Sequence, residues 1–194
     1  MRLPAGKKIF PFVLSFWLSG LVAVSSCNAG APIGRQMVIH KVQELGLEIW
    51  TEVEPAWETR LDKSAGAPTF IAETPASTYP PAGMTWTVPG QQFTAQEFPT
   101  AAQGAVYQAA INYGLPAAQA KALPLKTARY GDLNGYESTF SASAGGEPVD
   151  VKVFFGHRPG KPAVAMQVFT QKDKLPHISE NIRRSWTHIR YLAP

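Results

Sequence analysis

Hydrophobic and polar residues alternate most regularly between positions 135 and 171, in three runs separated by turn residues. A period of two along the chain is the pattern of a half-buried strand. Gly145-Gly146 separates the first two runs and Pro159-Gly160 the next two, and both pairs favour tight reversals of the chain. The pattern therefore predicts an antiparallel meander with strands over 135–143, 149–157 and 162–171.

Centring a tight turn on each of these pairs also predicts which residues face each other across the meander. In every predicted pair an apolar side chain faces another, and a slip of one residue would move the side chains to the opposite face of the sheet. The predicted pairs are Tyr136 with Phe155 and Val164, Phe140 with Val151 and Val168, and Ala142 with Val149.

Shorter patterns add elements on both sides of the meander. Alternation over 47–54 predicts a strand that stops at a proline, and 57–63 is predicted to be its partner strand. Helices are predicted over 99–113, which a glycine terminates, and over about 176–189, where isoleucines and a tryptophan recur at three- and four-residue steps and face the sheet. The Pro-rich segment 68–89 is predicted to be a long connection between elements. In a compact domain such a connection is functional or covers a face of the sheet.

The order of these elements resembles a known family. A meander reading GYESTFSASAGGEPVDVKVFF and then PAVAMQVFTQ, followed by a last helix LPHISENIRRSWTHI, is similar to the PsbP/DcrB-like fold over about residues 47–192. The resemblance implies an α+β fold in which an antiparallel β-sheet is flanked by helices, an α/β/α sandwich. It also implies non-enzymatic roles, as a bacterial envelope lipoprotein or as an accessory subunit that docks on a larger complex.

The N-terminal residues predict an export signal. Arg2, Lys7 and Lys8 precede an apolar run over 9–24 that ends in small residues. This is the pattern of a secretory signal, and the run is short for a membrane span, which needs about 20 apolar residues.

The residues that follow resemble the lipobox of bacterial lipoproteins, Val24-Ser25-Ser26-Cys27, and Cys27 is the only cysteine of the chain. The resemblance implies cleavage before Cys27, acylation of Cys27 and, because Asn28 rather than aspartate follows, sorting to the outer membrane. We therefore predict a lipoprotein signal peptide over 1–26, a lipidated tether over 27–46 and one α+β domain over 47–192, on the periplasmic side of the outer membrane. The alternative is a secreted protein without lipid that is cleaved at Ala29-Gly30-Ala31.

The charge balance gives no sign of a nucleic-acid partner. The chain has 18 Lys and Arg against 14 Asp and Glu, but three of the basic residues, Arg2, Lys7 and Lys8, lie in the predicted signal. The remaining 15 nearly balance the 14 acidic residues, so the basic character of the whole chain does not indicate nucleic-acid binding.

Motifs of the common catalytic and cofactor sites are absent from the sequence. Gly-x-Ser-x-Gly, Ser-x-x-Lys, Gly-x-Gly-x-x-Gly and the P-loop pattern do not occur. His177 and His188 share about one face of the last predicted helix, but eleven residues separate them by about 16 Å, which is too far for one metal ion. Glu48, Glu52 and Glu54 are predicted to form a solvated strand face. We expect no catalytic residue, no metal site and no cofactor.

Two groups of residues are candidates for contacts with a partner. Tyr79 and Trp86 lie in the Pro-rich segment, where stiff aromatic side chains could bind a protein of the envelope, or alternatively cap one face of the sheet. Arg183 and Arg184 belong to a basic cluster on the last helix that could meet anionic headgroups or an acidic partner, or simply form the helix's polar face. A carrier or chaperone of a small apolar ligand, held between sheet and helix, is the second functional hypothesis.

Overall fold

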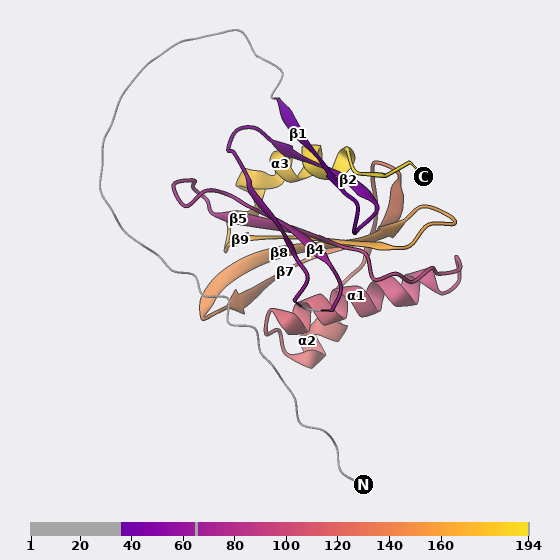
Figure 1. The fold of residues 1–194 in the computed structure, drawn as a ribbon. Helices are drawn as coiled ribbons and strands as arrows, with labels where there is room; N and C mark the ends of the chain where they lie inside the picture. Colours follow the sequence, from indigo (N-terminus) through magenta and orange to yellow (C-terminus); the bar gives the residue numbers. More distant parts are fainter. Residues whose placement is uncertain (1–35, 65, 194) are drawn as a thin grey trace.

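The chain folds into three layers in the computed structural model, which describes residues 36–64 and 66–193. A seven-stranded sheet forms the middle layer, helices α1 and α2 lie on one face, and α3 with a three-stranded sheet lies on the other (Figure 1). All the strand pairs are antiparallel, so the predicted α+β class is confirmed.

The order of strands in the large sheet is β3-β4-β5-β9-β8-β7-β6, and in the small sheet it is β1-β2-β10. The strands are β1 (Met37–Val42), β2 (Leu47–Glu52), β3 (Glu58–Asp62), β4 (Thr69–Glu73), β5 (Ala82–Thr87), β6 (Lys126–Tyr130), β7 (Leu133–Ala144), β8 (Glu147–His157), β9 (Val164–Gln171) and β10 (Arg190–Tyr191). The helices are α1 (Phe98–Asn112), α2 (Ala117–Lys121) and α3 (Leu175–Thr187).

The predicted meander is formed by β7, β8 and β9, and the register of its first hairpin is confirmed. Tyr136 pairs with Phe155, and the pairs expected of Phe140 and Ala142 are also found. Gly145 and Gly146 form the two-residue turn with φ of 61° and 92°, a conformation that suits glycine.

The register predicted for the second hairpin is wrong by one residue. Phe155 pairs with Ala165 rather than Val164, and Val151 pairs with Phe169 rather than Val168. The turn centred on Pro159-Gly160 is present, because the Lys161 amide donates to the Arg158 carbonyl at 3.0 Å. Pro162 follows it and has no amide hydrogen for the ladder, while the Ala163 amide donates to Gln91 instead, so pairing resumes one residue later.

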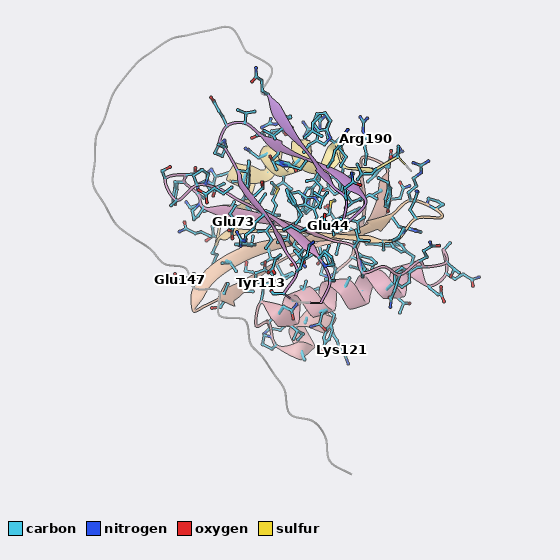
Figure 2. All side chains as sticks on the ribbon, viewed as in Figure 1. Glu44, Glu73, Tyr113, Lys121, Glu147 and Arg190 are labelled. Carbon is cyan, nitrogen blue, oxygen red and sulfur yellow. The ribbon has the colours of Figure 1, made fainter. Side chains whose placement is uncertain are left out.

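The large sheet has a buried core on each face, and the observed register places Met166 opposite Phe154 on the side of α3. Val151, Val153 and Phe140 pack against α1, whereas Phe154 and Met166 pack against α3. Apolar side chains fill the space between the layers, as the stick view shows (Figure 2).

Both predicted long helices are present. Helix α1 starts at Phe98 and is followed by Gly114 with a φ of 81°, the left-handed conformation that ends many helices. Helix α3 buries Ile178, Ile182 and Trp186 against the large sheet, as the spacing of its apolar residues predicted.

The N-terminal part of the domain differs from the prediction in two ways. Strand β1 lies inside the segment predicted as a tether, 27–46, so regular structure is already present before residue 47. Strand β3 pairs with β4 in the large sheet and not with β2, whose neighbours are β1 and β10.

The Pro-rich segment is not a long connection. It contains β4 and β5, which are paired with each other, and β5 also pairs with β9 near the middle of the large sheet. Its prolines lie at positions 68, 75, 80, 81 and 89, which are all outside the strands, where a missing amide hydrogen costs no ladder bond.

Candidate functional site

The predicted partner residues Tyr79 and Trp86 lie in different environments. Trp86 has no exposed surface and packs on Phe70 in the core, so its assignment to partner binding is corrected: it forms part of the sheet's packing. Tyr79 is 69% exposed in the loop between β4 and β5. The Lys174 ammonium lies 5.5 Å from the centre of its ring, which makes this loop tip an aromatic and cationic point on the surface.

The other predicted residues include the proposed lipid site. Cys27, with the whole predicted signal peptide, lies outside the described residues.

Arg183 is exposed on α3 and forms an ion pair with Glu180 at 2.6 Å, which lowers the pKa of that glutamate below its ordinary value. A pair this exposed contributes little to stability.

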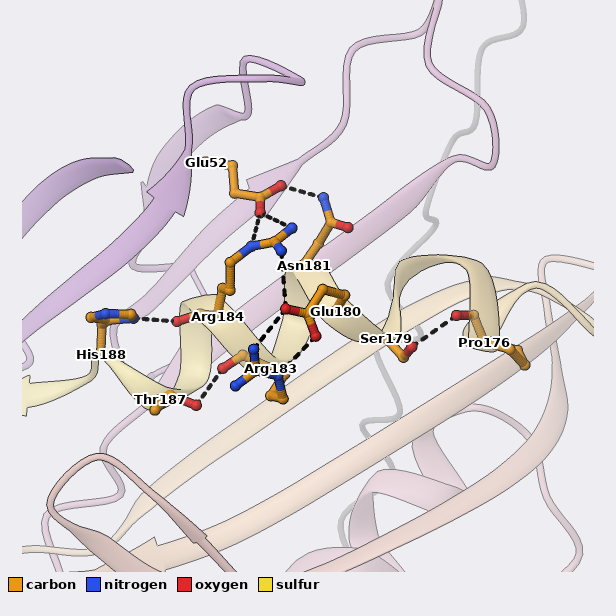
Figure 3. A network of polar contacts seen from close by, with 9 residues as sticks. All are labelled: Glu52, Pro176, Ser179, Glu180, Asn181, Arg183, Arg184, Thr187 and His188. Carbon is orange, nitrogen blue, oxygen red and sulfur yellow. Dashed lines mark hydrogen bonds and ion pairs between the residues drawn. The ribbon is translucent and has the colours of Figure 1, made fainter. Parts of the chain in front are cut away.

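Arg184, whose side chain is 23% exposed, is held against β2 by a carboxylate that the sequence pattern predicted to lie on a solvated face. Glu52 of β2 is only 1% exposed, and the Arg184 guanidinium and the Asn181 amide both donate to it (Figure 3). Arg184 also donates to Glu180 at 3.0 Å. The expectation of a solvated Glu52 is therefore wrong, because α3 lies over this end of β2 and supplies the partners that a buried charge requires.

Two further contacts fasten α3 to β2. The Ser185 hydroxyl donates to the Trp50 carbonyl, and the His188 ring stacks on the Trp50 indole with ring centres 5.1 Å apart. The indole of Trp50 in turn donates to the Glu48 carboxylate at 2.9 Å. Strand β2 and helix α3 thus form one continuous outer surface.

We call this outer surface, with β1 beside it, the upper face. The register of β1 on β2 sets Met37 opposite Glu52, Ile39 opposite Trp50 and Lys41 opposite Glu48 on this side, while Leu47 and Ile49 point into the core. The upper face consists of Met37, Ile39, Lys41, Glu48, Trp50, Glu180, Arg183, Arg184, His188 and Arg190; Glu52, on the same side of β2, is buried.

The upper face combines exposed apolar groups with a slight positive charge. Ile39 is 48% exposed, and Trp50 is partly exposed beside it. Apart from Arg184, which pairs with the buried Glu52, its three basic residues (41, 183 and 190) outnumber its two glutamates (48 and 180) by one. Such a surface suits contact with a partner that is partly apolar and partly anionic.

A cluster of three titratable side chains, Tyr130, Glu137 and Lys152, lies on the large sheet beside α3. The Tyr130 hydroxyl donates to Glu137 at 2.7 Å, and the Lys152 ammonium donates to the same hydroxyl at 2.9 Å. Burial raises the pKa of Tyr130, and hydrogen bonds to Tyr130 and Glu137 raise the pKa of Lys152 despite its burial. Both pKa shifts move these groups away from neutral pH, so the arrangement fits an ion-pair network better than a general base.

Two hollows lie on the surface of the described part of the chain. One, of about 550 Å³, is lined by Arg129, Asp132 and Arg190 among others. The other, of about 560 Å³, lies where the start of α1 meets the edge of the sheet, and Phe98, whose ring stacks on His157 at 4.0 Å, lines it. Burial lowers the pKa of His157, which leaves a neutral imidazole beside this second hollow at neutral pH.

The part of the chain that the structure describes contains no candidate for a metal site or for a membrane-spanning helix. Residues 36–64 and 66–193 contain no cluster of three or more histidines, cysteines or carboxylates placed to hold a metal ion. Within the same residues, no helix combines the length and the apolarity that crossing a bilayer requires.

Comparisons with known proteins assign no family to the chain. It matches no family model and no curated protein. Among solved structures it is similar to a protein from Bacteroides thetaiotaomicron, with 9% identity over 76% of this chain and a TM-score of 0.47, and the match spans only 45% of that protein. It is also similar to a Pseudomonas aeruginosa protein of unknown function proposed to be a regulator, with 17% identity, a TM-score of 0.42, and coverage of 81% of this chain and 96% of that one.

Proposed function

We propose that the chain is a lipid-anchored envelope protein, held on the periplasmic side of the bacterial outer membrane, whose domain is a non-enzymatic binding module. The observation that carries the proposal is the sequence Val24-Ser25-Ser26-Cys27, which follows a basic and then apolar leader. The three-layer order, with a meander and a last helix on the sheet, supports the PsbP/DcrB-like sandwich as the architecture of this module.

The distance between the proposed anchor and the folded domain supports a position close to the membrane. Gln36, the first described residue, is nine residues after Cys27. Nine residues span at most about 30 Å when fully extended. A bacterial lipoprotein carries two or more acyl chains, which hold a protein stably on a bilayer.

Binding of a protein is better supported than carriage of a ligand inside the domain. Side chains fill both spaces between the layers, including Trp86 and Trp186 on one face of the sheet and Val106 on the other, all fully buried. Tyr79 and Lys174 form the exposed loop tip where we place the contact with an envelope protein.

The test begins with the anchor. The chain expressed in bacteria with its own leader is compared with a Cys27→Ser variant by mass spectrometry and by membrane fractionation. We expect an acylated, membrane-bound protein in the first case and a soluble, unacylated one in the second. A mature chain that is unacylated and soluble with Cys27 intact would contradict the proposal.

The partner contact is tested by pull-down from membranes. A Tyr79→Ala variant is compared with a Lys121→Ala control on α2, which lies in the lower layer (Figure 2). We expect both variants to stay folded and only the first to lose co-purifying envelope proteins. An unchanged set of partners would remove Tyr79 from the contact.

A carrier of a small apolar ligand is the second candidate, and the hollow beside Phe98 is the observation that favours it. Native mass spectrometry of the purified chain tests this directly. A bound lipid that a Phe98→Ser variant loses would place the carrier function ahead of protein binding.

A further inference from the structure

The exposed apolar side chains of the domain are concentrated at one place. Four large hydrophobic residues are exposed in the described part of the chain, and three of them lie on or next to the β1–β2 hairpin: Val38 at 41%, Ile39 at 48% and Val53 at 36%. Trp50 lies directly opposite Ile39 in the pairing of the two strands. Ile39 and Trp50 belong to the upper face, whereas Val38 points to the opposite side of the hairpin, so the open end of the hairpin is an apolar corner of the domain at the margin of the upper face.

The chain enters the domain at this same corner. The Val53 amide donates to the Gln36 carbonyl at 2.9 Å, which ties the first described residue to the end of β2. The eight residues between Cys27 and Gln36 join the proposed anchor to this corner, and no more than about 30 Å of extended chain separates Cys27 from Gln36. Of all the surfaces of the domain, an anchor at Cys27 would hold this one nearest the bilayer.

We propose that the upper face docks on the phospholipid surface of the leaflet that carries the anchor, an inference that rests on the proposed acylation of Cys27. The partner is the lipid surface because the upper face as a whole combines the two groups that bilayer interfaces bind. Ile39 and Trp50 supply the apolar and amphipathic side chains that enter the boundary between headgroups and acyl chains. Lys41 and Arg183 supply cations for lipid phosphates.

The backbone of β1 limits how deep this docking goes. Strand β1 is an edge strand and pairs only with β2 among the residues that the structure describes. Its outer amide and carbonyl groups need water or a partner, which the hydrocarbon core does not offer. The upper face therefore lies at the depth of the headgroups, with Ile39 as its most deeply placed side chain.

The test measures the lipid contact of single positions in the full acylated chain. Cys27 is the only cysteine, and its sulfur is consumed by the lipid, so an added cysteine can be labelled alone with an environment-sensitive fluorophore. Ile39→Cys reports on the upper face, and Met37→Cys, on the same side of β1, repeats the measurement should the first variant fail to fold. Ala118→Cys on α2, in the layer on the other side of the large sheet, is the matched control (Figure 1).

The labelled proteins are bound to vesicles of phosphatidylethanolamine and phosphatidylglycerol that contain a nitroxide-labelled phospholipid as quencher. We expect the label at position 39 to lose most of its fluorescence and to shift its emission to the blue, while the label at position 118 changes little. Equal quenching at the two positions in vesicle-bound protein would overturn the docking and leave the anchor intact.

Two other outcomes also overturn the proposal. A chain that carries no acyl mass and stays off the vesicles refutes the anchor, and the docking with it. A label at position 39 that is protected in native outer membranes but unquenched in the vesicles identifies an envelope protein, rather than lipid, as the occupant of the upper face.

Discussion

Replacing Glu52 by alanine removes a buried carboxylate that fastens β2 to α3. Two residues of the helix, Asn181 and Arg184, donate to its two oxygens, and its exposed surface is only 1%. The variant leaves the amide and the guanidinium without this acceptor and opens a space at the junction of the two elements. We expect the free energy of unfolding to fall.

The size of the loss follows from what remains around Arg184. Deleting one partner of a buried ion pair costs about 3–5 kcal/mol. In the variant, the Arg184 side chain keeps its 23% exposure to solvent and its ion pair with Glu180 at 3.0 Å, so its charge retains one partner. We therefore expect a loss near the lower limit, about 3 kcal/mol. Glu73→Ala is the control, because its pair with Arg60 is 31% and 49% exposed and contributes at most about 1 kcal/mol.

Urea unfolding followed by tryptophan fluorescence measures both losses, in chains that start at residue 27 with Cys27→Ser. A third variant, Glu52→Leu with Arg184→Met, removes both charges, and we expect it to be close to the parent chain in stability because no unpaired charge remains buried. The reasoning is refuted if Glu52→Ala costs no more than the Glu73→Ala control, or if the double variant is as unstable as Glu52→Ala.

Four other predictions can be checked in the same chains. Trp86→Ala should destabilise the fold by about 3–5 kcal/mol in urea unfolding, and a loss below about 1 kcal/mol would contradict its place in the core. Gly104→Ala, where an added Cβ meets nothing within 4 Å, should stabilise α1 by up to about 1 kcal/mol. Gly135→Ala should destabilise by about 1–3 kcal/mol, because its Cβ would lie 2.1 Å from a backbone oxygen of the next strand; the opposite order of thermal midpoints would refute both. Burial lowers the pKa values of His40 and His157 below 6.5, so the unfolded chain binds protons more readily and stability should fall as the pH drops below about 6.5. Replacing both histidines by asparagine should flatten this pH dependence of the urea midpoint, and an unchanged slope would show that other groups cause it.

The elements that the sequence predicted well depend on local chemistry. The Gly145-Gly146 turn needs only its two positive φ values, and it sets the register of β7 on β8 by itself. The apolar spacing of α3 and the stop at Gly114 also involve residues within a few turns of each other. Such signals lie within a short window of the sequence, so they can be read without knowledge of the rest of the fold.

The errors arose where a distant segment decides the outcome. Pro162 shifted the second hairpin by one residue because Ala163 found a hydrogen-bond partner in Gln91, more than seventy positions away. Trp86 could be an exposed anchor or a core residue by its local pattern, and the pairing of β5 with β9 settled the matter.

Some residues of the candidate site could be predicted from local sequence, and others could not. The basic cluster on α3 and the cysteine of the proposed anchor could be named from the sequence, as could Tyr79. The burial of Glu52 and the exposed corner around Ile39 could not, because α3 comes more than a hundred residues after β2 and covers Glu52 while leaving Ile39 of the neighbouring strand exposed. Local periodicity determined which strands and helices form, and long-range packing alone decided which of their side chains face water, since the exposure of a residue depends on neighbours that its own segment does not contain.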